Sequence, residues 1–158
     1  MTDGRDQQAE SRIVVGVDGS EASKEALRWA ARQAEMTGAS VQAVSTWHLP
    51  SAAYGMAVPQ LTGYDLAPAV EQTLRGAIKE ALGEHPRVRV SAVVIEGMPS
   101  PTLLKTAVDA DLLVVGSRGH GEFTGMLLGS VAQHCVSHAP CPVVIVRHRP
   151  PPAQGPAG

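Results

Sequence analysis

The sequence predicts an α/β fold in which one parallel sheet carries helices on both of its faces. Short apolar segments alternate along the chain with segments that have the 3.6-residue period of amphipathic helices. This alternation is typical of β-α-β units. Apolar residues make up 44% of the 158 residues but aromatic residues only 3%. The core must therefore be built from Val, Leu, Ile and Ala, which suits a parallel sheet covered by Ala-rich helices.

The predicted elements form a single β-α-β-α-β-α-β-α-β succession, as expected for one domain of this length. In order they are strand 12–17, helix 21–36, strand 40–46, helix 68–82, strand 88–95, helix 101–108, strand 112–115, helix 129–137 and strand 142–147. The strands at 12–17 and 112–115 are almost entirely apolar, so both are expected at the centre of the sheet. The strand at 88–95 alternates in its first half.

The helix boundaries follow from residues that favour particular termini. Ser20 is expected to cap the first helix, and Gly38 to end it. Pro68 is expected to open the second helix, and the pair Ser100-Pro101 predicts an N-cap followed by proline at the first helical position. The apolar positions of the second helix match the helical period: Val70, Leu74, Ala77, Ile78, Ala81 and Leu82.

Three segments fall outside this pattern. Residues 1–11 are polar and residues 149–158 are rich in Pro and Gly, so both are predicted to be disordered tails of a domain at 12–148. Residues 47–64 form an irregular connection, and connections of this length inside a domain are often functional.

Composition excludes several classes of protein. The formal net charge is −2 and no block of like charge occurs, which argues against nucleic acid as a partner. No basic, apolar leader and no long apolar span is present, so we expect a cytoplasmic protein with no membrane partner. Cys135 and Cys141 are interpreted as small buried apolar side chains; a redox pair is the alternative, without CxxC spacing to support it.

The segment Gly116–Val131, GSRGHGEFTGMLLGSV, is predicted to bind an anion. An apolar strand leads into its glycines and a helix leaves it, an arrangement that presents backbone N–H groups to a phosphate. It contains no lysine and lacks the GxxxxGK[ST] spacing, so Arg118 would supply the positive charge. Gly119 and Gly129 are expected to allow close approach of the backbone or a positive φ. His120 either touches a phosphate or is solvated.

A second candidate ligand-binding loop, Asp18-Gly19-Ser20, lies after the first strand. Ligands of open α/β sheets bind beyond the carboxyl ends of the strands, where the strand order reverses. If the first and fourth strands are neighbours, Asp18 and the glycine loop face one crevice. The alternative role for Asp18 is capping of the helix alongside Ser20, and the two roles are compatible.

The glycine loop also matches the pattern G-x2-G-x9-G-[ST] through Gly116, Gly119, Gly129 and Ser130. This resembles the ATP-binding signature of the universal stress protein family. The segments IVVGVDGS, DLLVVGSRG, LLGSVAQ and HAPCPVVIVR resemble that family in the same order, over about residues 12–147. The resemblance implies a Rossmann-like, doubly wound, five-stranded parallel sheet of order 3-2-1-4-5, in which the first and fourth strands are neighbours.

The resemblance also implies roles for individual residues. Asp18 corresponds to the acidic residue near the ribose and the metal, Mg²⁺ or Mn²⁺. Val17 would line the adenine side, and the backbone of Val44 would meet adenine. Val115 and Gly116 end the fourth strand.

The phosphate side has a similar set of implied roles. Arg118 and Gly119 would begin the phosphate loop, and Gly129, Ser130 and Val131 would form the helix N-terminus that holds phosphates. The next position often carries a hydroxyl in the family but is Ala132 here, so one phosphate hydrogen bond is in doubt. The resemblance further implies a homodimer through strand 142–147, an apolar edge strand that needs a cover.

The function expected from these observations is that of an ATP-binding regulatory protein of the stress response, acting through nucleotide-dependent conformation or partner binding. No motif for catalysis is present, so no catalytic residue is predicted and at most slow ATP hydrolysis is expected. The alternatives are a weak ATPase with residues 47–64 as a lid and a nucleotide-independent dimeric adaptor. His134 and His138 have the i, i+4 spacing of a zinc pair but no third ligand nearby in sequence, so an exposed or partly buried pair is favoured.

Overall fold

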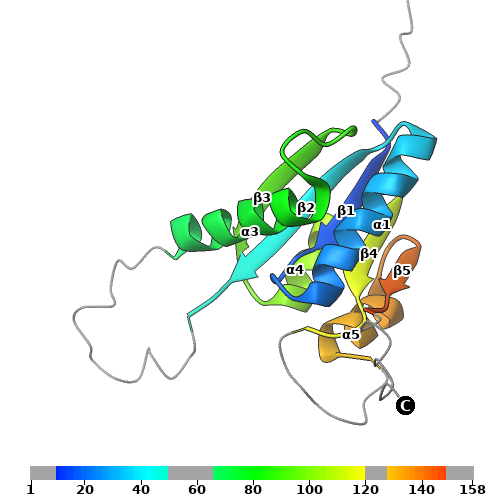
Figure 1. The fold of residues 1–158 in the computed structure, drawn as a ribbon. Helices are drawn as coiled ribbons and strands as arrows, with labels where there is room; N and C mark the ends of the chain where they lie inside the picture. The colour runs from blue at the N-terminus through cyan, green and yellow to red at the C-terminus, as the bar shows by residue number, and fades with distance from the viewer. Residues whose placement is uncertain (1–9, 50–65, 120–127, 149–158) are drawn as a thin grey trace, which may run out of the picture.

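Five parallel strands form one sheet of order β3-β2-β1-β4-β5 (Figure 1). The structure is a computed structural model and describes residues 10–49, 66–119 and 128–148. Its elements are β1 (Arg12–Gly16), α1 (Glu21–Thr37), β2 (Ser40–Trp47), α3 (Ala67–Leu82), β3 (Val90–Glu96), α4 (Pro99–Thr106), β4 (Leu112–Gly116), α5 (Ser130–His138) and β5 (Val143–Val146). The fold class and the strand order predicted from the sequence are confirmed. Residues 1–9 and 149–158 of the predicted tails, and residues 50–64 of the predicted 47–64 connection, lie outside the described residues.

The helices cover the sheet in two layers (Figure 1). One core cluster joins the sheet to α1 and α3 and includes the fully buried Leu27 and Leu74. The other joins it to α4 and α5 and includes Leu103 and Leu113. Both faces of the central strands β1 and β4 are therefore apolar, which explains why their sequences show no polar alternation.

The first helix begins and ends as its sequence predicts. The Ser20 hydroxyl accepts a hydrogen bond from the backbone N–H of Ser23 at 3.3 Å. Gly38 has a φ of 78°, and its N–H donates to the carbonyl of Ala34. A left-handed residue at this position favours glycine, which lacks the steric penalty of a Cβ.

The start of α4 differs from the prediction. Ser100 was expected to be the N-cap, but the helix begins at Pro99 and Met98 is the N-cap residue. Pro99 is the first helical residue, and both Pro99 and Pro101 lie in the first turn, where a missing N–H leaves no helical hydrogen bond unmade.

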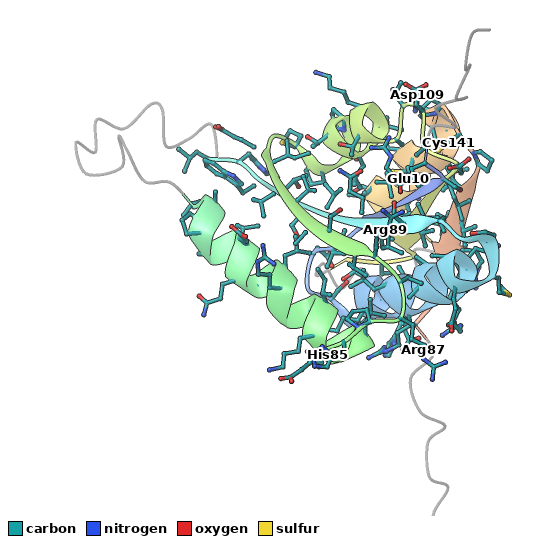
Figure 2. All side chains as sticks on the ribbon, turned by 90° about the horizontal axis from the view of Figure 1, so that it is seen from above. Glu10, His85, Arg87, Arg89, Asp109 and Cys141 are labelled. Carbon is teal, nitrogen blue, oxygen red and sulfur yellow. The ribbon has the colours of Figure 1, made fainter. Side chains whose placement is uncertain are left out.

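The edge of the sheet opposite the strands' carboxyl ends is held by polar contacts. The Arg12 guanidinium donates to the carbonyl of Thr106, the last residue of α4, at 3.2 Å and to the carbonyl of Val108 at 2.9 Å. The Asp111 carboxylate accepts from the Arg12 N–H at 2.7 Å and from the Ser11 hydroxyl at 3.0 Å, and these bonds lower the pKa of Asp111. Figure 2 shows Glu10 next to Arg89, with which it forms an ion pair.

Both cysteines lie in the described part of the chain and neither forms a disulfide. Cys135 lies on the buried face of α5 and is fully buried, while Cys141 is half-buried before β5 and is labelled in Figure 2. Burial raises the pKa of both thiols, which keeps them protonated and unreactive at neutral pH. Across the residues described, no helix is both long and apolar enough to cross a membrane.

Candidate functional site

A cavity of about 600 Å³ opens at the carboxyl edge of the sheet, a volume typical of small-molecule sites. The ends of β1, β2 and β4 form its floor, and residues of α3, α4 and α5 form its walls. Because β1 lies between β2 and β4, the cavity extends across the point where the strand order reverses. One of its ends lies between β2 and α3, and the other between β4 and α5.

The end between β4 and α5 is built from backbone. Residues 117–119 leave β4, and Gly129 brings the chain back at the N-terminus of α5. The Gly129 N–H donates to the carbonyl of Ser117 at 2.7 Å and so closes the base of the loop. Within the described residues, no side chain caps α5. The N–H groups of its first turn, and the positive end of its dipole, therefore suit an anion in the cavity.

Four glycines line the cavity, and the surroundings that a β-carbon would meet differ from one to the next. A β-carbon at Gly116 would lie 2.9 Å from the backbone carbon of Ala22, so the packing of α1 against β4 excludes one. At Gly16 the nearest atom would be a methyl group of Leu103, also at 2.9 Å. At Gly119 it would be a carboxylate oxygen of Asp18, at 2.7 Å.

Gly129 has no such neighbour in the described part of the chain. Its φ of −69° and ψ of 164° are open to any residue, and a β-carbon there would make ordinary contacts with Ser117 O at 3.4 Å and with Arg118 Cα at 3.5 Å. Gly119 is not among the glycines with positive φ either. A positive φ at Gly119 and Gly129 was therefore a wrong prediction. The other predicted reason for glycine, close approach of the backbone to a ligand, stays a prediction.

Asp18 lies at the middle of the cavity, between the two ends. One carboxylate oxygen accepts from the N–H of Ser20 at 2.9 Å and from its hydroxyl at 2.5 Å, which is the helix-capping arrangement foreseen as an alternative. The other oxygen is the one beside Gly119. The structure thus brings Asp18 against the glycine loop while it also orders the start of α1.

The end between β2 and α3 is mainly apolar. Val17 and Val44 are buried on its floor, and Leu66, Ala69 and Val70 approach from the start of α3. Val115 is buried on the floor of the same cavity at the end of β4. Hydrogen bonds hold the end of β1 against β2: the Val17 N–H donates to Val44 O at 2.8 Å, and the Ser45 hydroxyl donates to Val17 O at 2.5 Å. A flat, apolar ring fits this end better than a charged group would.

The structure brings together every predicted site residue that it describes. All of them line this cavity: Val17, Asp18, Val44, Val115, Gly116, Arg118, Gly119, Gly129, Ser130 and Val131. His120 lies outside the described residues. Ala132 also lines the cavity, at the position where the sequence departs from the family.

Sequence reasoning missed the contribution of α3 and the polar floor. Thr73 and Val70 reach the cavity from α3, and Ser45, Thr46 and Ser117 line it at the strand ends. The α3 residues belong to an amphipathic helix and no motif marks them. The strand-end hydroxyls could have been found, because each follows the apolar part of its strand on the carboxyl side.

Asp18 is the acidic residue that lines the cavity among the described residues. No group of three or more His, Cys, Asp or Glu residues that could hold a metal occurs in the described ranges. A divalent cation at Asp18 would therefore share its coordination with oxygens of a bound ligand and with water, as Mg²⁺ commonly does with substrate phosphates.

The profile of the universal stress protein family matches residues 10–147, which is most of the chain. The chain belongs to the universal stress protein family. Among curated universal stress proteins, one from Mycobacterium tuberculosis is 36% identical over 139 residues, which are 85% of this chain and 45% of the relative. A second from the same species is 33% identical over an alignment of 166 positions, which covers 95% of this chain and 52% of the relative. The chain thus spans about half the length of the curated universal stress proteins that it matches.

Solved universal stress protein structures share the fold. One, determined in complex with cAMP, is 27% identical with a TM-score of 0.62, over 89% of this chain and 98% of the other. UspA from Lactobacillus plantarum is 24% identical with a TM-score of 0.68, over 87% and 97%. A universal stress protein from Archaeoglobus fulgidus, determined in complex with dAMP, is 21% identical with a TM-score of 0.58, over 86% and 97%.

Proposed function

We propose that this chain binds ATP together with Mg²⁺ or Mn²⁺ and acts as a regulatory protein of the stress response. Its output would be a nucleotide-dependent conformation or the binding of a partner. The observation that carries the proposal is the division of one cavity into an apolar end and a backbone-lined end, with Asp18 between them. A nucleotide has the same order of chemistry: a flat base, a polar sugar and charged phosphates.

Gly129 supports the position of the phosphates. Neither its backbone conformation nor the described neighbours require glycine, so a ligand that approaches the α5 N-terminus is the best physical reason for it. The first-turn N–H groups of Ser130, Val131 and Ala132 would donate to phosphate oxygens. Arg118, which also lines the cavity, would add positive charge.

The base would occupy the apolar end, over Val17 and Val44 and under α3. Asp18 would hold the cation and meet the ribose. The relative determined with cAMP supports an adenine nucleotide, because it is 27% identical to this chain over nearly all of its own length. A nucleotide-independent adaptor would have no use for this cavity.

We propose that the chain pairs with a second copy through β5, which lies at the open edge of the sheet. The carbonyls of Pro142 and Val146 accept hydrogen bonds from β4, from Leu113 and Ser117. The backbone N–H and C=O groups of successive residues point to opposite sides of a strand. Those of Val143 and Ile145 therefore point away from β4. An antiparallel second copy of β5 would satisfy them, and two-fold pairing is the commonest symmetry of soluble oligomers.

The proposal is tested by identifying the nucleotide that co-purifies with the protein and following its turnover. We expect mass spectrometry of the denatured, purified protein to release an adenine nucleotide, with ATP prominent. Incubation of the protein with ATP and Mg²⁺ for hours should leave most of it unhydrolysed. Protein that is folded but releases no nucleotide, and takes up none when ATP is supplied, would overturn the proposal. Fast release of more ADP than there is protein, mole for mole, would instead favour the ATPase alternative.

A further inference from the structure

The exposed face of α5 carries two histidines that the nucleotide site does not use. His134 and His138 are one helical turn apart and both are exposed. Their rings are stacked, with centroids 4.7 Å apart and planes inclined by 25°. His138 is the last residue of α5, at the end opposite the Gly129 N-cap, and His134 lies one turn before it.

We propose that His134 and His138 form a bidentate surface site for a divalent transition metal of the Zn²⁺, Ni²⁺ or Cu²⁺ class. Side chains at i and i+4 share one face of a helix, and neutral imidazole is a preferred ligand of these metals. With Zn–N bonds of about 2.0–2.1 Å, a tetrahedral ion needs its two nitrogens about 3.3 Å apart. The rings are stacked with centroids 4.7 Å apart, so rotation of the side chains would have to bring one nitrogen of each ring to that separation.

A backbone contact already selects the metal-binding tautomer of one ring. His138 Nδ1 lies 3.2 Å from the carbonyl oxygen of His134. A carbonyl can only accept, so the proton of the neutral ring is on Nδ1 and the Nε2 lone pair is available for a metal. Histidines that ligate metals commonly donate their other ring N–H to such a carbonyl, which fixes the orientation of the ring.

The position in the helix favours a cation as well. His138 is in the last turn of α5, where the carbonyl ends of the helix give a negative potential. No third protein ligand joins the pair within the described ranges. Water would therefore complete the coordination, which makes the site exchangeable and open to a further ligand.

A calorimetric titration of the full chain tests the site. NiCl₂, ZnCl₂ or CuCl₂ is added in a non-chelating buffer without nucleotide. We expect one saturable site, weakened at least tenfold by His134→Ala or by His138→Ala. The variant His85→Ala removes an exposed histidine elsewhere and should bind as the parent does. Circular dichroism of each variant checks that the helix content is unchanged.

Moving one histidine along the helix tests whether metal binding depends on the i, i+4 spacing or only on the number of histidines. The double variant His138→Ala with Val136→His keeps the same count, but positions two apart do not face each other on a helix. Val136 is 55% exposed and should tolerate the change. We expect this variant to bind as weakly as His138→Ala does. Parent-like binding by the relocated variant or by the His134→Ala/His138→Ala double variant would overturn the proposal, as would the absence of any saturable site in the parent.

Discussion

Gly129→Val is the perturbation that follows most directly from the shape of the cavity. The new β-carbon would lie over residues 117–119, 3.4 Å from the carbonyl oxygen of Ser117, and its two methyl groups would extend into the space proposed for the phosphates. If the side chain displaces the phosphates from two first-turn N–H groups, the loss is about 3–6 kcal/mol, since a hydrogen bond to a charged group contributes about 1.5–3 kcal/mol. We therefore expect the affinity for ATP to fall at least about 100-fold.

Calorimetric titration with ATP and Mg²⁺ measures this loss, and thermal unfolding measures whether the domain survives the substitution. We expect the melting temperature to change little, because the extended backbone of Gly129 is open to valine. Gly76→Val is the matched control: it makes the same change at an exposed position of α3 where a β-carbon would meet no atom within 4 Å. Gly129→Ala should lie between the parent and Gly129→Val. Parent-like ATP affinity in folded Gly129→Val would refute the placement of the phosphates.

Four further outcomes are expected. Asp18→Ala should weaken ATP binding more with Mg²⁺ present than in EDTA; equal losses would leave Asp18 only its capping role. Ile145→Pro removes an N–H that points to the open edge of β5 and should turn a dimer into a monomer in sedimentation; a parent that is monomeric at tens of micromolar, about the range of weak specific dimers, would exclude the dimer. Leu27→Ala empties a fully buried position and should lower the free energy of unfolding, measured in urea, by about 2–5 kcal/mol; an unchanged free energy of unfolding would contradict its place in the core. The folded-state pKa of Asp111 is lowered by hydrogen bonds from Arg12 and Ser11, so its stabilisation is present at neutral pH and is lost as the pH falls below its ordinary value of 3.8. Asp111→Asn should therefore lower the melting temperature at pH 7, and its difference from the parent should shrink toward pH 3.

Much of the fold could be predicted because its boundaries rest on local chemistry. Ser20 caps α1 and Gly38 ends it in the left-handed conformation, as the residue types alone indicate. The apolar strands β1 and β4 are central because only strands covered on both faces lack polar alternation. At α4 the sequence offers two prolines that both suit the first turn, so it leaves open at which of them the helix begins; the structure begins it at Pro99.

The candidate site likewise has a part that could be predicted from the sequence and a part that could not. The glycine loop and Asp18 are marked by residue type at strand ends, so the sequence places them near one another once the strand order is known. The wall that α3 supplies is not marked, because Val70 and Thr73 face the cavity only through the packing of α3 against β2. The reason for glycine at position 129 also needed the structure, which shows an extended backbone without strain and ordinary contacts of a β-carbon with residues 117–119 beside the cavity.

The most direct test of the central claim is a calorimetric titration of the purified parent chain, stripped of bound nucleotide, with ATP in the presence of Mg²⁺. The account predicts one saturable site per chain, with weaker binding when EDTA replaces Mg²⁺. A folded parent that releases no heat of binding at millimolar ATP, and gains no thermal stability from it, would contradict the assignment of the cavity to a nucleotide.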